Sequence, residues 1–300
     1  MNDNIKNIAV IGLGLIGSSI LHALKLNFEN KFFTYAYDIE IKNRDIVKKL
    51  SVASKVCNKL ADAVIHADLI FMSVPVGCMG DVAKEISPFL KKGVIITDTG
   101  STKVSVINDV KPFFTNDVFF IPSHPLAGTE YSGPESGFAN LFRNRYWIII
   151  GNKNDINAKI IKNILKNFGS FVEFMDAEYH DKILAITSHL PHLIAFTIVG
   201  TASDLEMDLK NDVIRFSATG FRDFTRLASS DPIMWRDVFI NNTDSVLEML
   251  QRFNEDLTAL QKLIRQKDSL KLHEFFSRTK KIRSQIIEAG QHEPENYKKK

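Results

Sequence analysis

Residues 8–17 have the sequence IAVIGLGLIG, and this stretch predicts the fold of the amino-terminal half. A short apolar strand pattern is followed at once by Gly12, Gly14 and Gly17 in the spacing GxGxxG. In a strand–turn–helix unit, the first glycine permits a tight turn, the second lets the main chain approach a pyrophosphate, and the third lets helix and strand pack closely. The N-terminus of the helix then offers N–H groups and a positive dipole end to phosphate. The stretch therefore predicts a dinucleotide-binding site.

An acidic residue follows at the spacing expected for a ribose contact. Asp38 ends the next predicted strand, where a carboxylate can accept a hydrogen bond from a ribose 2′-hydroxyl. The same carboxylate would repel a 2′-phosphate, and the nearest arginine is Arg44. We therefore predict NAD rather than NADP as the cofactor. The residues predicted to bind it are Gly12, Leu13, Gly14, Leu15, Ile16, Gly17, Asp38, Val74 and Pro75.

The rest of the first half alternates β-rich runs with amphipathic segments, a pattern typical of a parallel sheet covered by helices. Beyond Asp176 the β pattern ends, and residues 177 to about 287 have helical patterns with a polar break near Asp231 and Pro232. We predict an α/β fold, with a Rossmann-type, mostly parallel sheet domain over residues 1–176 and an all-helical domain over residues 177–300. The predicted strands are residues 8–11, 32–37, 69–73, 94–97, 118–121, 147–150 and 171–174, and the predicted helices of the first half are residues 18–26, 41–49, 81–89, 102–109 and 156–168.

Length and composition limit the class of protein. A chain of 300 residues with 45% hydrophobic and 24% charged residues is typical of a globular protein with about two domains. The 38 basic and 35 acidic residues nearly balance, and no basic stripe with interleaved aromatic residues occurs, so nucleic acid is not an expected partner. The two cysteines, Cys57 and Cys78, lie outside any CxxC pair, which indicates a reducing compartment.

Neither a signal peptide nor a membrane span is predicted. The start of the chain, Met1 to Asn7, is polar. The most apolar stretch, residues 183–199, contains His189, Pro191 and His192, which a lipid-facing helix would not tolerate together. We therefore expect this stretch to be a buried core helix, and the protein to be cytoplasmic without a membrane partner.

One predicted helix has a heptad-like apolar stripe, with members spaced alternately four and three residues apart. Such a stripe fits a core-facing helix and an intersubunit seam equally well. Ser245 and Glu248 have the spacing of a capping box, which predicts that the helix begins near Ser245. The stripe consists of Val246, Leu250, Phe253, Leu257, Leu260 and Ile264.

Polar residues follow two of the predicted strands, in the clusters 97–101 and 123–130. Ligands bind outside the carboxyl ends of the strands in open α/β sheets, so we expect Ser101 and His124 to face the crevice that holds the nicotinamide. An imidazole with a pKa of about 6.5 is suited to remove a hydroxyl proton as hydride leaves. The alternatives are that Ser101 caps the next helix and that His124 caps a main-chain group in a loop.

Four segments resemble the prephenate and arogenate dehydrogenases of tyrosine biosynthesis: DTGSTK at 98–103, HPLAGTE at 124–130, HDKILAITSHLPH at 180–192 and GFRDFTR at 220–226. The resemblance extends from the glycine loop to about Trp235. It implies NAD-dependent oxidative decarboxylation of a cyclohexadienol, in which hydride leaves the alcohol carbon for NAD, carbon dioxide leaves the opposite ring carbon, and the ring becomes aromatic. It also implies that the helical domain is a substrate and dimerisation domain, which favours the apolar stripe as the surface between two copies of the chain.

The resemblance also implies roles for single residues. His124 would take the proton of the ring hydroxyl, with Ser101 helping to orient it. Arg226 would bind a substrate carboxylate, because a guanidinium offers two parallel N–H donors. The remaining substrate-site residues are His192 and Trp235 at the side-chain end of the pocket, and Glu130 and Asp223 as supporting or gating residues.

The residues alone leave parts of this assignment open. Arg222 lies four residues before Arg226 on a predicted helix, so spacing does not decide which of them holds the carboxylate. His180 and His192 lie in apolar helical segments, where a core histidine is the usual explanation. Pro191 would cost about 3 kcal/mol inside a helix, and a break there would help to shape a pocket.

Several alternatives stay open. Arogenate in place of prephenate would keep the chemistry, and no acidic residue placed for its ammonium group is evident near His192. A β-hydroxyacid dehydrogenase or imine reductase would leave the HPLAGTE motif unexplained, and a non-catalytic NAD-binding dimer would make His124 and Arg226 incidental. No metal site is predicted. Neither a fused chorismate mutase nor a carboxy-terminal regulatory domain is expected.

Overall fold

The structure is a computed structural model that describes residues 5–29, 31–204, 212–213 and 215–288. The chain divides into two compact units, Met1–Val246 and Leu247–Lys300. Part of the polar start of the chain, residues 1–4, on which the expectation of no signal peptide depends, lies outside the described residues. The domain boundary expected at residue 176 falls inside the first unit and stays a prediction.

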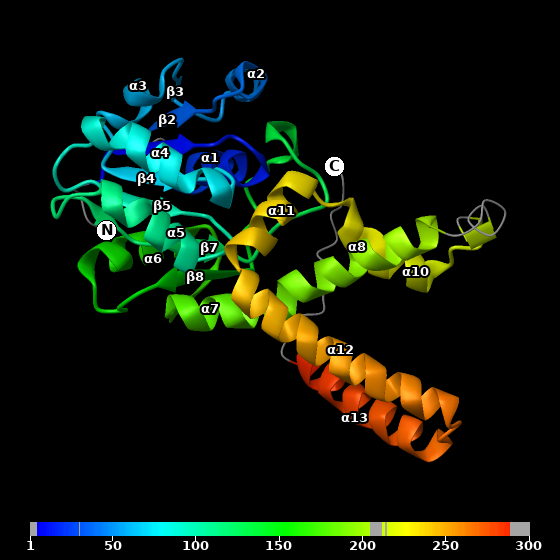
Figure 1. The fold of residues 1–300 in the computed structure, drawn as a ribbon. Helices are drawn as coiled ribbons and strands as arrows, with labels where there is room; N and C mark the ends of the chain where they lie inside the picture. Colours follow the sequence, from blue (N-terminus) through cyan, green and yellow to red (C-terminus); the bar gives the residue numbers. More distant parts are fainter. Residues whose placement is uncertain (1–4, 30, 205–211, 214, 289–300) are drawn as a thin grey trace. The chain divides into compact units, whose positions relative to one another are not determined.

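The first unit contains a six-stranded sheet in the order β3-β2-β1-β4-β5-β6, and every neighbouring pair is parallel (Figure 1). The central strand β1 pairs with β2 on one side and β4 on the other, which is the strand order of a Rossmann-type sheet. The predicted fold class is confirmed. The two-residue β3 was not predicted, because it is too short to show a strand pattern. The strands are β1 (Asn7–Ile11), β2 (Phe33–Tyr37), β3 (Lys55–Val56), β4 (Leu69–Met72), β5 (Ile95–Asp98) and β6 (Phe119–Phe120).

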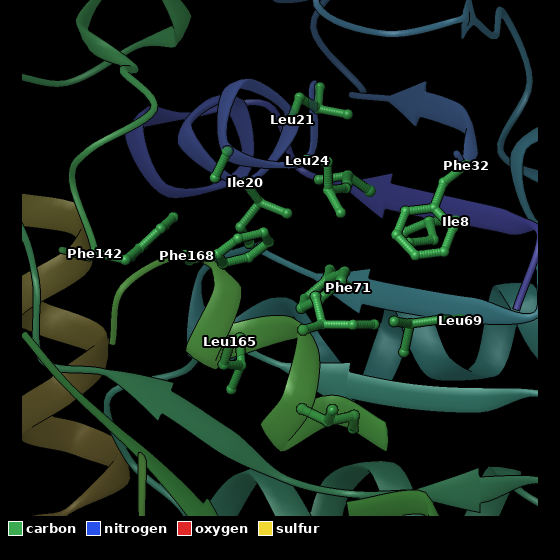
Figure 2. Packing of buried hydrophobic residues seen from close by; sticks show 14 of the residues in the cluster. Ile8, Ile20, Leu21, Leu24, Phe32, Leu69, Phe71, Phe142, Leu165 and Phe168 are labelled. Atoms are coloured by element: carbon green, nitrogen blue, oxygen red, sulfur yellow. The ribbon is translucent and has the colours of Figure 1, made fainter. Parts of the chain in front are cut away.

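Helices cover both faces of this sheet, because successive side chains of a strand point to opposite faces. One face, which includes Ile8 and Phe71, packs against α1 and α6, as Figure 2 shows from close by. The opposite face, which includes Ala9 and Met72, packs against α3, α4 and α5. The helices of this part are α1 (Leu15–Phe28), α2 (Ile41–Leu50), α3 (Leu60–Val64), α4 (Met79–Ile86), α5 (Val104–Val110) and α6 (Ile156–Asn167).

A second, three-stranded sheet has the order β7-β8-β9. In it, β7 pairs antiparallel with β8, and β8 pairs parallel with β9. The predicted strands at residues 147–150 and 171–174 belong to this second sheet. The sequence predicts no strand at residues 123–125, and that expectation is wrong. A three-residue segment that ends in proline carries no alternating pattern, so the sequence gives no sign of the strand that separates the two sheets. The strands are β7 (Ser123–Pro125), β8 (Tyr146–Ile150) and β9 (Phe171–Met175).

The described residues beyond 176 form helices, as the loss of the β pattern predicts. The Asp176 carboxylate accepts the Tyr179 N–H at 2.8 Å, which caps the first of these helices. The Asp231 carboxylate caps α11 in the same way, at the polar break that the sequence predicts. The helices are α7 (Ala177–Leu184), α8 (Leu190–Ser203), α10 (Thr219–Thr225), α11 (Pro232–Asn241), α12 (Thr243–Arg265) and α13 (Ser269–Glu288).

The predicted capping box at the start of α12 is wrong. The helix begins at Thr243, so Ser245 lies inside it. A single residue, Asn242, separates α11 from α12, and its carbonyl oxygen accepts the Val246 N–H at 3.0 Å. Glu248 accepts from Arg252 instead, at 2.9 Å. Within the apolar stripe, Val246 is buried, Leu257 and Ile264 are exposed and the other three members are half-buried. The role of the stripe as an intersubunit seam stays a prediction.

One long helix, Ala177–Ser203, consists of α7, a five-residue π-helix (Ala185–His189) and α8. By length and composition alone it could cross a membrane. The expectation of a buried core helix is wrong, because the helix packs along one side against α10 and the turn Arg226–Ser229 and leaves Ile186 and Ile198 exposed. Pro191 does not end it, because the π-helix Ala185–His189 lies directly before α8 and its wider turn changes the hydrogen-bond pattern that a proline would otherwise interrupt.

Candidate active site

The glycine loop has the backbone that its motif predicts. Gly12 has a φ of +87°, and a Cβ there would lie 2.5 Å from the carbonyl oxygen of Ser73. A Cβ at Gly17 would lie 1.9 Å from the carbonyl oxygen of Gly12, whereas a Cβ at Gly14 would meet nothing within 4 Å. Packing therefore requires Gly12 and Gly17, and Gly14 leaves open space at the start of α1.

This open space fits the pyrophosphate of a dinucleotide. Gly14 is the N-cap residue of α1 and has no side chain to occupy the first N–H groups of the helix. The Ser73 hydroxyl next to the loop is buried without a hydrogen-bond partner among the described residues, and Val74 and Pro75 follow it at the carboxyl end of β4. The glycine loop and the segment after β4 are thus the residues that would hold NAD.

Asp38 is held beside the glycine loop by main-chain N–H groups. Its Oδ2 accepts from Leu13 at 2.6 Å, and its Oδ1 accepts from Glu40 at 2.8 Å. The guanidinium of Arg44 donates to the carbonyl oxygens of Asp38 and Ile39, at 2.5 and 3.2 Å. Because these donors are engaged by the main chain, a 2′-phosphate would meet the Asp38 charge before it met a free arginine. The geometry favours NAD over NADP.

His124 lies on β7, and its side chain is buried. His124 Nδ1 is 2.9 Å from His180 Nε2, and His180 Nδ1 is 2.7 Å from Asp181 Oδ1. Asp181 also accepts the N–H groups of Lys103 and Val104, at 2.8 and 2.9 Å, where α5 begins. A chain of three side chains therefore connects His124 to α7, and the same carboxylate fixes the start of α5.

The order of these groups determines which nitrogen of each imidazole carries the proton. A carboxylate can only accept, so His180 Nδ1 donates to Asp181, and His180 Nε2 is left with a lone pair. That lone pair accepts from His124 Nδ1–H. His124 Nε2 is then unprotonated and able to accept a proton. The chain thus prepares His124 as a base.

Burial and neighbouring charges keep His124 neutral. Burial lowers the pKa of His124 well below 6.5, and the charges of His180, Lys103 and His189 lower it further. The pKa of His180 is also lowered, mainly by burial, although its hydrogen bond to Asp181 opposes the shift. Because a base must be unprotonated, these shifts extend the active form of His124 to acidic pH.

Ser101 is half-buried between β5 and α5. The alternative that it caps the following helix is wrong, because α5 begins at Val104 and receives its cap from Asp181 on α7. The alternative that His124 caps a main-chain group in a loop is also wrong, because it lies on a strand and bonds the His180 ring. The orienting role of Ser101 stays a prediction.

The structure brings the other predicted substrate residues together in two pairs. Arg226 Nη1 is 3.6 Å from Glu130 Oε2, and both side chains are exposed. The His192 ring stacks on Trp235, with centroids 3.7 Å apart and planes inclined by 22°. Burial lowers the pKa of His192, and the charge of Arg226 lowers it further, so Arg226 acts on the stacked pair electrostatically. Asp223 pairs with its neighbour Arg222 at 3.7 Å, and its gating role stays a prediction.

Four residues of the site were given no chemical role from the sequence: Asp98, Lys103, His180 and Asp181. Asp98 and Lys103 form a buried ion pair, and the other two orient His124. The adjacent acid in the pair His180-Asp181 is the one sequence signal that indicates an imidazole with a fixed partner, and it is a weak signal because core histidines are common. Among the residues that the structure describes, no cluster of His, Cys, Asp or Glu could hold a metal ion.

Family models match most of the chain. The nucleotide-binding domain of prephenate dehydrogenase matches residues 22–174, and the prephenate dehydrogenase dimerization domain matches residues 176–278. The chain belongs to the prephenate dehydrogenase family. It is therefore an NAD-dependent oxidoreductase of tyrosine biosynthesis with a Rossmann-type domain and a dimerisation domain, as predicted. Membership sets aside the β-hydroxyacid dehydrogenase, the imine reductase and the non-catalytic dimer.

Individual relatives agree with this membership. A cyclohexadienyl dehydrogenase from Zymomonas mobilis is 41% identical over 93% of this chain and 95% of its own length. A prephenate dehydrogenase from Lactococcus lactis is 34% identical over 93% of this chain and 77% of its own. The crystal structure of prephenate dehydrogenase from A. aeolicus in complex with hydroxyphenyl propionate and NAD+ has a TM-score of 0.86 and 30% identity, and covers 94% of this chain and 98% of that chain.

The long apolar helix lies inside the region that matches the dimerization domain. The matched residues 176–278 include the whole of Ala177–Ser203. In a homodimer, a second copy of the chain covers apolar surface that a monomer would leave in water.

Proposed function

We propose that the protein is a prephenate dehydrogenase, which converts prephenate to 4-hydroxyphenylpyruvate with NAD as oxidant. The observation that carries the proposal is the hydrogen-bonded chain from Asp181 through His180 to His124. It leaves His124 with an unprotonated nitrogen, and the oxidation of an alcohol needs a base. Membership in the family supports a ring hydroxyl as the group that this base deprotonates.

His124 takes the hydroxyl proton and later returns it. Bound NAD supplies the hydride acceptor. As hydride leaves the alcohol carbon, the hydroxyl proton moves to His124 Nε2, and the imidazolium that forms still donates from Nδ1 to His180. When carbon dioxide leaves the opposite ring carbon, the electron pair of the broken bond enters the ring. The ring becomes aromatic, and its oxygen regains the proton from His124, so the reaction has no net consumption of protons.

Arg226 is proposed to bind a substrate carboxylate. Its ion pair with Glu130 is loose, at 3.6 Å, compared with the 2.7–2.9 Å that is usual for charge-assisted hydrogen bonds. A carboxylate that binds the guanidinium in bidentate fashion can therefore displace Glu130. Glu130 would act as a temporary partner that holds Arg226 until substrate arrives.

Absorbance of NADH in a mixture of purified protein, NAD and prephenate tests the proposal. We expect turnover with NAD and little with NADP. Arg226→Lys should raise KM for prephenate about 10–100-fold, because a bidentate partner of the substrate is lost. The matched control Arg222→Lys, on the neighbouring turn, should leave KM within twofold. The absence of NADH formation from prephenate would refute the proposed activity.

A second candidate substrate is arogenate, and one observation favours it. His192 Nδ1 is 2.8 Å from the Ser188 carbonyl oxygen, which can only accept, so His192 Nε2 has a lone pair. A lone pair can accept from the ammonium group of arogenate and cannot donate to the keto oxygen of prephenate. Trp235 Nε1 supports prephenate instead, because it is a buried donor without a partner among the described residues. The values of kcat/KM for the two substrates decide between them. His192→Phe should lower kcat/KM for arogenate more than kcat/KM for prephenate.

We also propose a cytoplasmic location, a homodimer formed through the helical region, and a domain boundary near residue 176. The family models, which end at residue 174 and begin again at residue 176, support the boundary. Light scattering of the purified protein should give twice the chain mass of 33.9 kDa. Limited proteolysis near residue 176 with release of an NAD-binding fragment would support the boundary.

A further inference from the structure

A completely buried ion pair lies behind His124. Lys103 and Asp98 both have side chains with 0% exposure, and Lys103 Nζ donates to Asp98 Oδ2. A buried lysine is costly unless its charge is paired and its remaining protons are bonded. Neither residue reaches the surface that would meet substrate, so the pair has a role other than direct binding.

The pair holds the main chain on both sides of Ser123, the residue before His124. Lys103 Nζ donates to the Ser123 carbonyl oxygen at 2.7 Å, and the Ser123 N–H donates to Asp98 Oδ1 at 3.1 Å. The Ser123 hydroxyl also donates to the Asp98 carbonyl oxygen at 2.8 Å. These bonds fix the peptide group from which His124 projects.

β7 needs this support because of its place in the sheet. It is an edge strand of three residues, so β8 is its one neighbouring strand. An edge strand leaves main-chain groups unpaired on its outer side, and in a buried strand these groups need partners. Asp98 and Lys103, from the end of β5 and the start of α5, supply them.

We propose that Asp98 and Lys103 are positioning residues, which hold His124 in register with His180 and keep a positive charge beside the catalytic imidazole. This inference rests on the proposed role of His124 as the base. The ion pair acts through the Ser123 main chain and through its field, and neither residue touches substrate.

The electrostatic part follows from the groups that surround His124. Burial is the largest cause of the lowered pKa of His124 and of His180, and the charge of Lys103 lowers both pKa values further. Three other charged or titratable groups act on these two histidines. His189 lowers the pKa of His124, and the carboxylates of Asp181 and Asp98 raise the pKa of His180. Removal of the lysine charge should therefore make His124 easier to protonate.

The test compares three variants of the full-length protein in the presence of NAD. Lys103→Met removes both the charge and the bond to Ser123, and Lys103→Arg keeps the charge but changes the bond. Asp98→Asn/Lys103→Met removes both charges, so it leaves no unpaired charge in the interior and guards against failure of the single variant to fold. The measurements are the pKa of His124 by NMR of isotope-labelled histidine, assigned with His124→Asn, and the pH profile of kcat/KM.

We expect Lys103→Met to raise the His124 pKa by about one pH unit, and the double variant to raise it less, because loss of the Asp98 charge acts in the opposite direction. Both variants should lower kcat about 10–100-fold, because both lose the bond from Lys103 that holds the Ser123 main chain. Lys103→Arg should lower kcat without moving the pKa. A matched control exists where β4 and β5 begin, at the amino ends of the strands of the six-stranded sheet. There Lys91 pairs with Asp68 and also donates to the His66 carbonyl oxygen at 3.1 Å. Asp68→Asn/Lys91→Met should leave both the His124 pKa and kcat unchanged.

An unchanged His124 pKa in folded Lys103→Met would overturn the inference, as would normal kcat in the folded double variant or an equal loss of kcat in the Asp68/Lys91 control. The NMR measurement needs no substrate. If prephenate is not turned over but the His124 pKa rises as expected, the proposed function fails and the positioning role of the pair stands.

Discussion

The six-stranded sheet has a lysine–aspartate pair at the amino ends of its strands, here called the amino edge, and another at their carboxyl ends, here called the carboxyl edge. The two pairs differ in burial. At the amino edge, Asp68 accepts the N–H groups of Lys6 and Asn7, at 2.8 and 2.7 Å, and pairs with Lys91. The side chains of Lys91 and Asp68 are 39% and 17% exposed. At the carboxyl edge, Asp98 and Lys103 bind main-chain groups in a similar way with no exposure at all.

The difference shows how one kind of interaction serves two purposes. Water can replace most of what the amino-edge pair provides, so that pair contributes stability of about 1 kcal/mol or less. At the carboxyl edge no water is available, so each bond is needed and fixes the position of its neighbours. Parallel strands bring their carboxyl ends to one edge, which is why the buried polar network and the cofactor loop lie on the same side of the sheet.

The largest difference in kcat is expected between substitutions of the histidines at the two edges. His124→Asn at the carboxyl edge should lower kcat about 1,000-fold, because an amide cannot accept the hydroxyl proton. NAD affinity should stay within twofold, as measured by fluorescence titration. His66→Asn, at the exposed amino edge, should leave kcat unchanged. A His124→Asn protein with more than a tenth of normal kcat would show that another group acts as the base.

Asp181→Asn should have the next largest effect, and should change two properties at once. The amide has one acceptor oxygen for a site where the carboxylate accepts from His180, Lys103 and Val104. We expect kcat to fall about 10–100-fold and the free energy of unfolding to fall by about 1–3 kcal/mol. In the control Asp155→Asn, which alters the cap of α6, urea denaturation should show a small loss of stability while kcat is retained.

Acidification should destabilise the folded protein through the histidines of the candidate site. The pKa values of His124, His180, His189 and His192 are all lowered in the folded protein, that of His189 to about 4. Below pH ~6.5 the unfolded chain binds protons that the folded chain does not, so stability falls as the pH falls. We expect Tm to decrease by several degrees between pH 7 and pH 5. His189→Asn should show a smaller decrease over this range, and an identical decrease would contradict the assignment.

The smallest effect is expected at the amino edge, in a lower pH range. Hydrogen bonds from Lys91, Lys6 and Asn7 lower the pKa of Asp68, against the effect of its burial. The stability that this carboxylate contributes is therefore present above pH ~3.9 and is lost as the pH falls through its folded pKa. Asp68→Asn should lower Tm by a few degrees at neutral pH, and the two proteins should converge once the pH lies below the folded pKa of Asp68. A difference that persists there would indicate a packing effect instead of an electrostatic one.

The sequence predicted the amino-terminal fold well because its signals are local. The spacing of Gly12, Gly14 and Gly17 and the alternation of strands and helices depend on neighbouring residues, and the structure has these elements within a few residues of the predicted ends. Hydrogen-bond partners that lie far apart in the sequence could not be predicted in this way. The cap of α5 comes from Asp181, 77 residues beyond Val104, and no local pattern indicates it. The same is true of β7, which is defined by its pairing with β8 and by the buried ion pair.

The helical region shows the other limit of a single sequence. The apolar character of Ala177–Ser203 was evident, but the sequence does not state whether the same chain or a second copy covers it. The candidate site was predicted in part for a similar reason. Ser101, His124 and Arg226 carry recognisable chemistry, whereas His180 acquires a role only from its position between His124 and Asp181.

The bond between Asp38 and the glycine loop limits how the cofactor preference of this enzyme can be redesigned. Removal of the carboxylate to admit a 2′-phosphate would also remove the acceptor for the Leu13 N–H, at 2.6 Å, and would loosen the turn that binds pyrophosphate. A useful replacement must therefore be uncharged and still accept a hydrogen bond, as asparagine or serine can. Arg44 would then have to leave two carbonyl oxygens before it could meet a phosphate, so engineering for NADP needs at least two coordinated changes.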